Sequence, residues 1–361
     1  MADDVAVVVY GASGFTGRLI CAELVRRNVS FAVAGRDRAK LTALSDSLGA
    51  AKPEVLVAAL DDAAALEAAV ARGRVALACA GPFQRMGAPV REAALAARRH
   101  YLDITGEAGY MLETAARDTE ARARGVALVN AVGFDVVPTD AAAVLAAEAA
   151  GGKPELVRIA IKFGGRATQG TTRSALESAD KGGLAYLAGR YQPEPVAADR
   201  WEAPFPEPLG ARSCVSIPWG DLATAPRSTG ARTVRTYMVV SSAVARAMPI
   251  LGLATKALSW GPAKRLAEHF VASLPEGPSD AERARATCAI LAEATSGNRS
   301  ARAWVTTGDG YDFTAQAAVE CAVRAAAPGF DRKGALTPTQ AFGARPLLDA
   351  LAEHGVRYGV D

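Results

Sequence analysis

The 361-residue chain is poor in the residues that build metal sites and disulfide frameworks. It has three histidines and five cysteines, and no two cysteines form a C-x-x-C pair. Scattered cysteines in an odd number are typical of reduced thiols in the cytosol, so we expect a cytoplasmic protein without disulfides or a thiolate zinc site. The histidines are isolated and no H-E-x-x-H motif occurs, so we expect no metal.

The chain also lacks a strong charge of either sign. Its 41 basic and 38 acidic residues give a formal net charge of +3, and no long block of like charges occurs. Nucleic-acid-binding arms need such blocks, so we expect no nucleic-acid partner. No basic stretch precedes the first apolar run, and the N-terminus therefore does not resemble a secretory signal.

No apolar run is long enough to cross a membrane. The most apolar segment, residues 243–260, is interrupted by Arg246 and Lys256, and its charge-free part falls far short of the roughly 20 residues that a span needs. We expect a buried or homodimer-forming helix here, with peripheral contact to a lipid surface as the alternative.

The first part of the sequence alternates between short apolar runs and helical patterns. Six runs are candidate buried strands: residues 5–10, 31–35, 54–60, 75–80, 101–105 and 126–131. This alternation is typical of parallel βαβ units. It predicts an α/β fold with a Rossmann-type, doubly wound parallel sheet in residues 1–150.

The regular alternation stops at Gly151 and Gly152, where we place a domain boundary. The second domain, residues 151–334, has strand candidates at 155–163 and 232–240. The proline- and glycine-containing stretch 189–230 between them is expected to form surface loops. A final helix and short strand are expected within residues 335–361.

Three glycines, in the sequence GASGFTG, join the first strand to a helical pattern. Gly11, Gly14 and Gly17 would allow a tight turn in which the backbone approaches a pyrophosphate at the positive end of the helix. A purely structural strand-to-helix turn is the alternative. The context of strand, glycine spacing and following βαβ units favours a dinucleotide site.

The end of the second strand distinguishes between nicotinamide cofactors, because it lies beside the adenosine ribose. A carboxylate here favours NAD, whereas this sequence continues AGRDRAKL and places Arg36 directly after Gly35. A guanidinium can bind the 2′-phosphate through two hydrogen bonds, so we expect NADP(H). If Asp37 rather than Arg36 faces the ribose, that preference weakens or reverses.

Two further loops follow predicted strands, after residues 75–80 and 101–105, at the edge where ligands bind in this architecture. After residues 75–80, Gly81 and Pro82 are expected beside the nicotinamide ribose with Phe83 against the ring. An ordinary turn before a helix is the alternative.

The Tyr-x-x-x-Lys pair of short-chain dehydrogenases is absent, since no tyrosine has a lysine four residues on.

Several longer motifs resemble the saccharopine dehydrogenase-like oxidoreductases, in particular their shorter branch of trans-acting enoyl reductases. They are YGASGFTGRL, AGRDRAKL, AGPFQRMGAPVREAALAARRHYLDITGE, NAVGFDVVPTD, QGTTRSALE and the C-terminal GALTPTQAFGARPLLDALAEHGVRYGV. The resemblance implies an NADP(H)-binding Rossmann domain, to which residues 335–361 return, and an inserted α/β domain over the substrate cleft. It implies these cofactor-binding residues: Gly11, Ser13, Gly14, Phe15, Thr16, Gly17, Arg36, Ala80, Gly81, Pro82 and Phe83.

Three carboxylates are candidate acids or bases, because each follows a strand predicted to end at the cleft: Asp103, Glu107 and Asp135. Each also has a structural alternative. Asp103 can hydrogen-bond loop amides, and Asp135 can cap a helix that starts near Pro138.

Together these features predict an NADPH-dependent reductase acting on a polarised C=C or C=O of an acyl or polyketide-type small molecule. A C=N reductase of amino-acid-type substrates is the first alternative, with Lys162, Arg166 and Arg173 as carboxylate-binding candidates. A cofactor-binding sensor or interaction protein without turnover is the second, because a fold does not fix a function.

Overall fold

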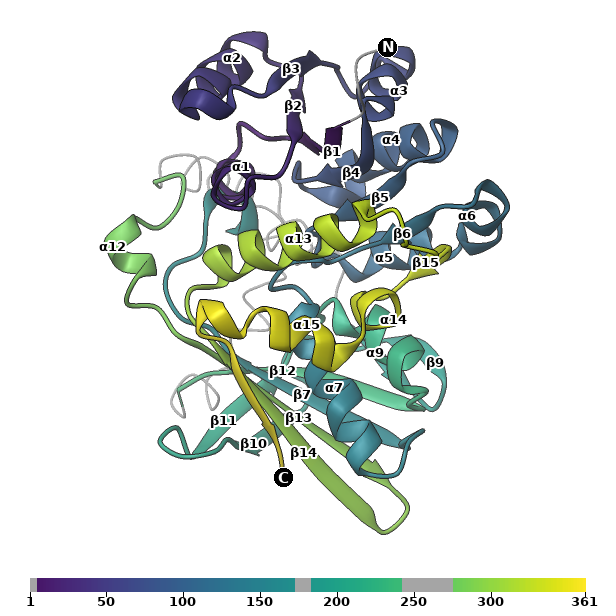
Figure 1. Ribbon diagram of the computed structural model, residues 1–361. Coiled ribbons are helices and arrows are strands. Elements are labelled where there is room, and N and C mark those ends of the chain that lie inside the picture. The colour runs from purple at the N-terminus through teal and green to yellow at the C-terminus, as the bar shows by residue number, and fades with distance from the viewer. Residues whose placement is uncertain (1–4, 173–182, 242–274) are drawn as a thin grey trace, which may run out of the picture. The chain divides into compact units, whose positions relative to one another are not determined.

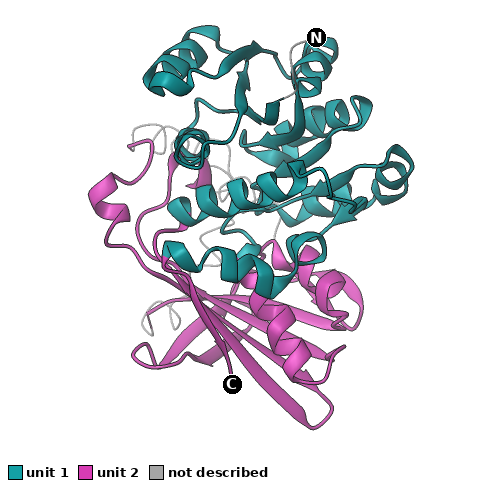
Figure 2. Ribbon diagram, in the orientation of Figure 1, with its two compact units in different colours: residues 1–137, 311–354 teal, residues 138–310, 355–361 magenta. Residues whose placement is uncertain are grey.

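The computed structural model describes residues 5–172, 183–241 and 275–361. The chain forms two compact units, one of residues 1–137 and 311–354 and the other of residues 138–310 and 355–361 (Figure 2). The predicted helix at 243–260 lies outside the described residues. None of the helices within the described ranges combines the length and apolar character needed to cross a membrane.

The first unit contains a seven-stranded parallel sheet, which confirms the predicted doubly wound Rossmann-type fold (Figure 1). The strand order is β15-β6-β5-β4-β1-β2-β3. The strands are β1 (Val5–Tyr10), β2 (Phe31–Gly35), β3 (Glu54–Val57), β4 (Gly73–Ala78), β5 (His100–Asp103), β6 (Ala127–Val129) and β15 (Gly334–Leu336). The carboxyl ends of β1, β4, β5 and β6 therefore follow one another along one edge of the sheet.

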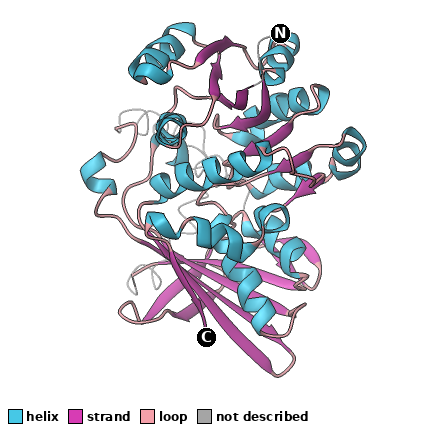
Figure 3. Cartoon of the chain, in the orientation of Figure 1, coloured by secondary structure: helices cyan, strands magenta, loops and turns pink. Residues whose placement is uncertain are grey.

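Helices alternate with strands through this unit (Figure 3). Alternate residues of β1, Val8 and Tyr10, pack in a buried cluster with Leu66 and Val70 of one helix and Val90 of the next. This cluster forms the core on one face of the sheet. The helices are α1 (Phe15–Arg26), α2 (Arg38–Ser47), α3 (Ala63–Ala71), α4 (Phe83–Ala96), α5 (Ala108–Ala115), α6 (Asp118–Arg124), α13 (Gly310–Ala326), α14 (Pro338–Phe342) and α15 (Ala344–Ala350).

The second unit is built on a mostly antiparallel sheet, with the path β10-β11-β12-β7-β13-β14-β16 and β8 and β9 off it. Trp201, Tyr237 and Leu291 belong to one apolar cluster on this sheet. The strands are β7 (Leu156–Lys162), β8 (Leu184–Leu187), β9 (Arg190–Pro193), β10 (Arg200–Pro204), β11 (Ala211–Ser216), β12 (Thr233–Val239), β13 (Cys288–Ser296), β14 (Arg299–Thr307) and β16 (Arg357–Val360), with helices α7 (Val137–Ala149), α9 (Asp221–Thr229) and α12 (Asp280–Arg283).

The prediction that residues 189–230 form surface loops is wrong, because β9, β10, β11 and α9 occupy much of that stretch. The prolines in this stretch do not exclude strands. Pro193 and Pro204 are the last residues of their strands, where proline is tolerated because the ladder ends there.

The unit boundaries fall between Val137 and Pro138 and between Gly310 and Tyr311, earlier in each case than the sequence-based boundaries at 150 and 335. Both lie in the first turns of helices, α7 and α13, where composition does not change. The C-terminal segment is divided between the units. β15 pairs with β6 in the first sheet, whereas β16 pairs with β14 in the second.

Candidate functional site

The glycine loop between β1 and α1 packs so tightly that side chains would not fit at two of its positions. Gly11 has a φ of +82°, and a Cβ there would lie 2.8 Å from the backbone nitrogen of Ala80. A Cβ at Gly17 would lie 2.4 Å from the carbonyl oxygen of Gly11. Both positions therefore require glycine, as the dinucleotide-binding hypothesis expects.

The start of α1 has the features of an anion-binding helix terminus. Its N-cap residue is the exposed Gly14, which has no side chain to cap the helix, and the first turn contains no acidic residue. Arg18 Nη1 donates to the carbonyl oxygen of Ser13 at 2.8 Å and fixes the loop. The backbone here suits a pyrophosphate, since an N-terminal helix end attracts negative charge.

The end of β2 presents one cation and one carboxylate with separate roles. Arg36 is exposed, and its charge is near enough to Tyr10 to oppose the rise that burial causes in the pKa of that phenol. Asp37 Oδ1 instead accepts the backbone N–H of Lys40 at 3.1 Å, and Asp37 is the N-cap of α2. This capping role gives the Asp37 carboxylate a local partner and leaves Arg36 as the residue suited to a 2′-phosphate. The residues present therefore fit NADP(H).

The loop after β4 contributes backbone rather than side chains to this edge. Pro82 is the N-cap of α4, and the preceding Gly81–Pro82 peptide is cis. The ring of Phe83 is only 6 % exposed and packs 6.1 Å from that of Tyr110. The structure thus places the Phe83 ring in the core beneath the loop.

Glu107 accepts the first two backbone amides of α4. Its Oε1 accepts the backbone N–H of Phe83 at 2.8 Å, and its Oε2 accepts that of Gln84 at 2.9 Å. Pro82 provides no side-chain cap, so this carboxylate from the loop after β5 replaces one. Glu107 therefore joins the loops that follow β4 and β5.

Asp103 joins the loops that follow β5 and β6. The side chain is fully buried; its Oδ1 accepts the backbone N–H groups of Thr105 at 3.1 Å and Ala131 at 2.9 Å. Its Oδ2 accepts Asn130 Nδ2 at 2.6 Å. Burial raises the pKa of Asp103 to about 6, although the hydrogen bonds it accepts act in the opposite direction. These contacts match the alternative in which Asp103 hydrogen-bonds loop amides.

Asp135 differs from the other two carboxylates, since it accepts no hydrogen bond from any residue that the structure describes. It is partly buried over Gly106, where a Cβ would lie 2.7 Å from Asp135 Oδ2. Burial raises the pKa of this carboxyl to about 7. A carboxyl that titrates near neutrality suits proton transfer.

The loop that carries Asp135 is fixed by the first turns of α13. Thr314 Oγ1 accepts the backbone N–H of Phe134 at 3.0 Å, and the rings of Phe134 and Phe313 meet edge to face at 5.9 Å. A Cβ at Gly133 would lie 2.7 Å from Thr314 Cγ2. Sequence reasoning missed Thr314 because 180 residues separate it from Phe134.

Two cations considered for carboxylate binding have partners within the second unit. Lys162 Nζ donates to the carbonyl oxygen of Thr287 at 3.1 Å. Arg166 Nη2 donates to the carbonyl oxygen of Gly277 at 2.9 Å and lies 3.7 Å from Glu282. Arg173, the third candidate, lies outside the described residues.

Known proteins that are similar to this chain carry the names of oxidoreductases. Residues 7–129 match the profile of the saccharopine dehydrogenase NADP binding domain. A provisionally named trans-acting enoyl reductase of Mycobacterium tuberculosis is 29 % identical, over 97 % of this chain and 96 % of its own. A saccharopine dehydrogenase-like oxidoreductase of Mus musculus is 30 % identical over 37 % of this chain and 35 % of its own.

The fold of the chain is also that of a solved relative. The saccharopine dehydrogenase (L-Glu forming) of Saccharomyces cerevisiae aligns with a TM-score of 0.67, 14 % identity, and coverage of 98 % of this chain and 99 % of that one. The profile match and the named relatives confirm the predicted resemblance, cofactor and enzyme class. Residues 7–129 thus match a saccharopine dehydrogenase NADP binding domain, and the chain is an NADP(H)-dependent oxidoreductase similar to the saccharopine dehydrogenase-like oxidoreductases.

Proposed function

We propose that this protein reduces a polarised C=C or C=O of an acyl-type substrate and that Asp135 supplies the proton. The observation that carries the proposal is that the three carboxylates at the sheet edge differ in their hydrogen bonds. Glu107 and Asp103 accept backbone amides, whereas Asp135 accepts no hydrogen bond from a described residue. Asp135 therefore holds a proton near neutral pH without giving up a structural contact.

The residues of the first unit divide the work of binding and proton transfer. The start of α1 and the exposed Arg36 bind the phosphates, and the backbone of Ala80, Gly81 and Pro82 lies along the next part of the edge. When bound there, NADPH would supply a hydride to the electron-poor atom of the substrate double bond. Asp135 then gives its proton to the other atom of that bond and regains one from water, so the substrate gains one hydride and one proton.

An acyl substrate is proposed because of the relatives that the chain resembles. The relative named as a trans-acting enoyl reductase matches over nearly the full length of both chains. A second protein of that name, from Mycobacterium ulcerans, is 37 % identical over 37 % of this chain and 33 % of its own. The contacts of Lys162 and Arg166 lend no support to an amino-acid substrate.

The proposal is tested by following NADPH consumption with three probes. These are an enoyl thioester, a β-ketoacyl thioester and the imine formed from a 2-oxo acid and an amine. We expect consumption with at least one thioester and a 10²- to 10⁴-fold lower kcat in Asp135→Asn, the usual contribution of a general acid. Asp46→Asn, which changes an exposed aspartate on α2, is the matched control. Consumption with the imine alone, or unchanged turnover in Asp135→Asn, would overturn the proposal.

A further inference from the structure

A closed ring of polar side chains lies buried behind the carboxyl ends of β5 and β6. Asn130 Nδ2 donates to Asp103 Oδ2 at 2.6 Å and lies 3.3 Å from Thr114 Oγ1. Arg91 Nη1 donates to the same Thr114 hydroxyl at 3.0 Å. The members of the ring are Asp103, Tyr101, Tyr110, Arg91, Thr114 and Asn130.

Two tyrosines close this ring on its other side. The Tyr101 and Tyr110 hydroxyls are 2.9 Å apart, and Tyr101 also hydrogen-bonds Asp103. The Arg91 guanidinium stands over the Tyr110 ring, 5.2 Å from its centroid. The ring thus holds a buried anion and a buried cation, Asp103 and Arg91, at 0 % and 6 % exposure. A network satisfied in this way is rigid, because each group that moved would leave a buried polar partner unpaired.

Asp103 transmits this rigidity to the surface of the site. One oxygen, Oδ1, accepts the amides of Thr105 and Ala131, which lie on two different loops. Gly106 follows on the first loop and Asp135 on the second, and the two are in close contact. Asp103 therefore ties together the two loops that carry Gly106 and Asp135.

We propose that Asp103 and Asn130 are positioning residues, which hold the Asp135 carboxyl against Gly106 by clamping the two loops together. The proposal rests on the proposed function, in that Asp135 is the group whose placement matters. It assigns Asp103 a role other than direct contact with substrate.

The clamp can be tested by exchanging its two members. In Asp103→Asn, the new side-chain amide has N–H groups that must face either the Asn130 Nδ2 or the backbone N–H groups of Thr105 and Ala131. Either arrangement places a donor against a donor. Asn130→Asp alone sets two carboxylates against each other at a site where Oδ2 and Nδ2 are 2.6 Å apart. The double variant D103N/N130D restores one donor and one acceptor at this contact. We therefore expect both single variants to lose the clamp and the double variant to recover it.

The readout is the titration of Asp135, followed by NMR with carboxyl-labelled aspartate in the full-length protein and assigned by Asp135→Asn. Loosened loops admit water to the carboxylate, which should lower the titration midpoint by about one pH unit. Loss of the Asp103 charge adds to this fall in Asp103→Asn, whereas the new carboxylate opposes it in Asn130→Asp. D103N/N130D should return it toward the wild-type value. The same midpoint in all four proteins would overturn the proposal, because a purely structural clamp would change stability alone.

Two further variants keep the outcome clear. If Asp103→Asn does not fold, Asn130→Ser removes the amide contacts to Asp103 Oδ2 and Thr114 Oγ1, keeps the backbone amides on Oδ1, and should lower the midpoint by a smaller amount. An unchanged midpoint in that folded variant also overturns the proposal. Asp135→Asn separates the two claims: normal turnover in that variant defeats the proposed acid role, whereas the titration in the other variants judges the clamp.

Discussion

Glu107 and Phe83 are joined by a hydrogen bond across two loops of the first sheet, although 24 residues separate them in the chain. The carboxylate takes the place of the missing N-cap side chain of α4 and accepts the Phe83 N–H at 2.8 Å. The loop expected to lie along the cofactor is therefore held by the loop after the neighbouring strand.

Glu107→Ala should weaken both folding and cofactor binding. Removing the carboxylate leaves the first amides of α4 without their acceptor, at an expected cost of about 1–2 kcal/mol in the free energy of unfolding. Denaturant unfolding and NADPH titration measure the two effects. Glu113→Ala on α5 removes a carboxylate that bonds the Gln84 side chain instead of its backbone, and should change both values much less. Equal effects in the two variants would contradict the capping role.

Arg36→Ala should weaken NADPH binding and leave NADH binding nearly unchanged. The guanidinium is expected to bind only the 2′-phosphate, and loss of a charge-assisted contact costs about 1.5–3 kcal/mol, or roughly 10- to 100-fold in affinity. Fluorescence titration of both cofactors measures this. Arg38→Ala removes a cation from the first turn of α2 and is the matched control. It should lower the affinity for NADPH less than Arg36→Ala does. An unchanged NADPH affinity in Arg36→Ala would remove this residue from the cofactor site.

The stability of the protein should fall as the pH rises toward 7, partly through Asp135. Burial raises the pKa of this carboxyl to about 7, above the value near 4 in an unfolded chain. Between these values the native state binds more protons than the unfolded state, so stability decreases with rising pH. Asp135→Asn should remove the part of this slope nearest pH 7 and raise the free energy of unfolding above pH 7 by up to about 4 kcal/mol, since each unit of pKa shift corresponds to about 1.4 kcal/mol.

Urea unfolding across this pH range measures the effect. The slope at lower pH should persist in Asp135→Asn, because burial also raises the pKa of Asp103 to about 6. Identical pH profiles in the wild-type protein and Asp135→Asn would contradict the raised pKa of Asp135.

Gly106→Ala should displace the Asp135 carboxyl and lower activity more than stability. The added Cβ would lie 2.7 Å from Asp135 Oδ2, which must move away. A shift of this size in a reacting group can lower kcat by about 10²-fold. Gly308→Ala is the control, since a Cβ there meets nothing within 4 Å. A fall in kcat no larger than in the control would show that the carboxyl position is unimportant.

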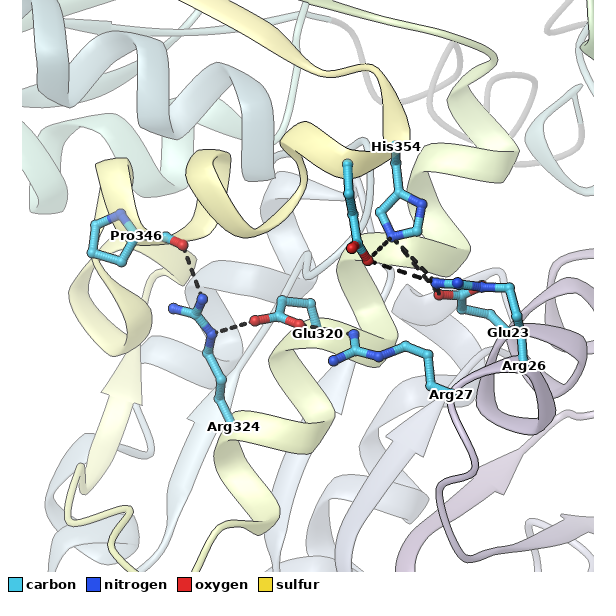
Figure 4. A network of polar contacts seen from close by, with 8 residues as sticks. Glu23, Arg26, Arg27, Glu320, Arg324, Pro346 and His354 are labelled. Atoms are coloured by element: carbon cyan, nitrogen blue, oxygen red, sulfur yellow. Dashed lines mark hydrogen bonds and ion pairs between the residues drawn. The ribbon is translucent and has the colours of Figure 1, made fainter.

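Glu320 links α1 to the C-terminal part of the first unit (Figure 4). It binds Arg27, the C-cap residue of α1, at 2.8 Å and Arg324 at 2.6 Å. Arg324 in turn donates to the carbonyl oxygen of Pro346 at 2.9 Å. Burial raises the pKa of Glu320, but hydrogen bonds from the two arginines outweigh it and lower the pKa overall. The contribution to stability is therefore present at neutral pH and lost as the pH falls below the ordinary glutamate range.

Glu320→Gln should lower the free energy of unfolding by about 1–2 kcal/mol at neutral pH, more than an exposed ion pair contributes. Thermal unfolding at neutral and acidic pH should show the difference from wild type shrinking in acid. The control is Glu353→Gln, since the Glu353 side chain is 68 % exposed and 3.9 Å from Arg26. A loss of stability in Glu320→Gln that does not depend on pH would contradict the role of the Glu320 charge.

The sequence predicted the first sheet well because its signals are local. The runs at 5–10 and 31–35 are confirmed as β1 and β2 with the same bounds, and the glycine loop lies between β1 and α1 as expected. The roles of the carboxylates were not predictable in the same way. The Phe83 amide that donates to Glu107 is 24 residues away, and the Thr314 hydroxyl that accepts the Phe134 amide is 180 residues away. Only the folded chain therefore distinguishes Asp135 from its neighbours.

The most direct measurement uses NADPH carrying two deuterium atoms at the nicotinamide C4, mixed with the enoyl thioester in ordinary water. Mass spectrometry should find one deuterium on carbon in the acyl product of the wild-type protein. The same product should form at least 10²-fold more slowly with Asp135→Asn, because the proton donor is missing. An acyl product without deuterium, or one formed equally fast by Asp135→Asn, would contradict hydride transfer assisted by Asp135.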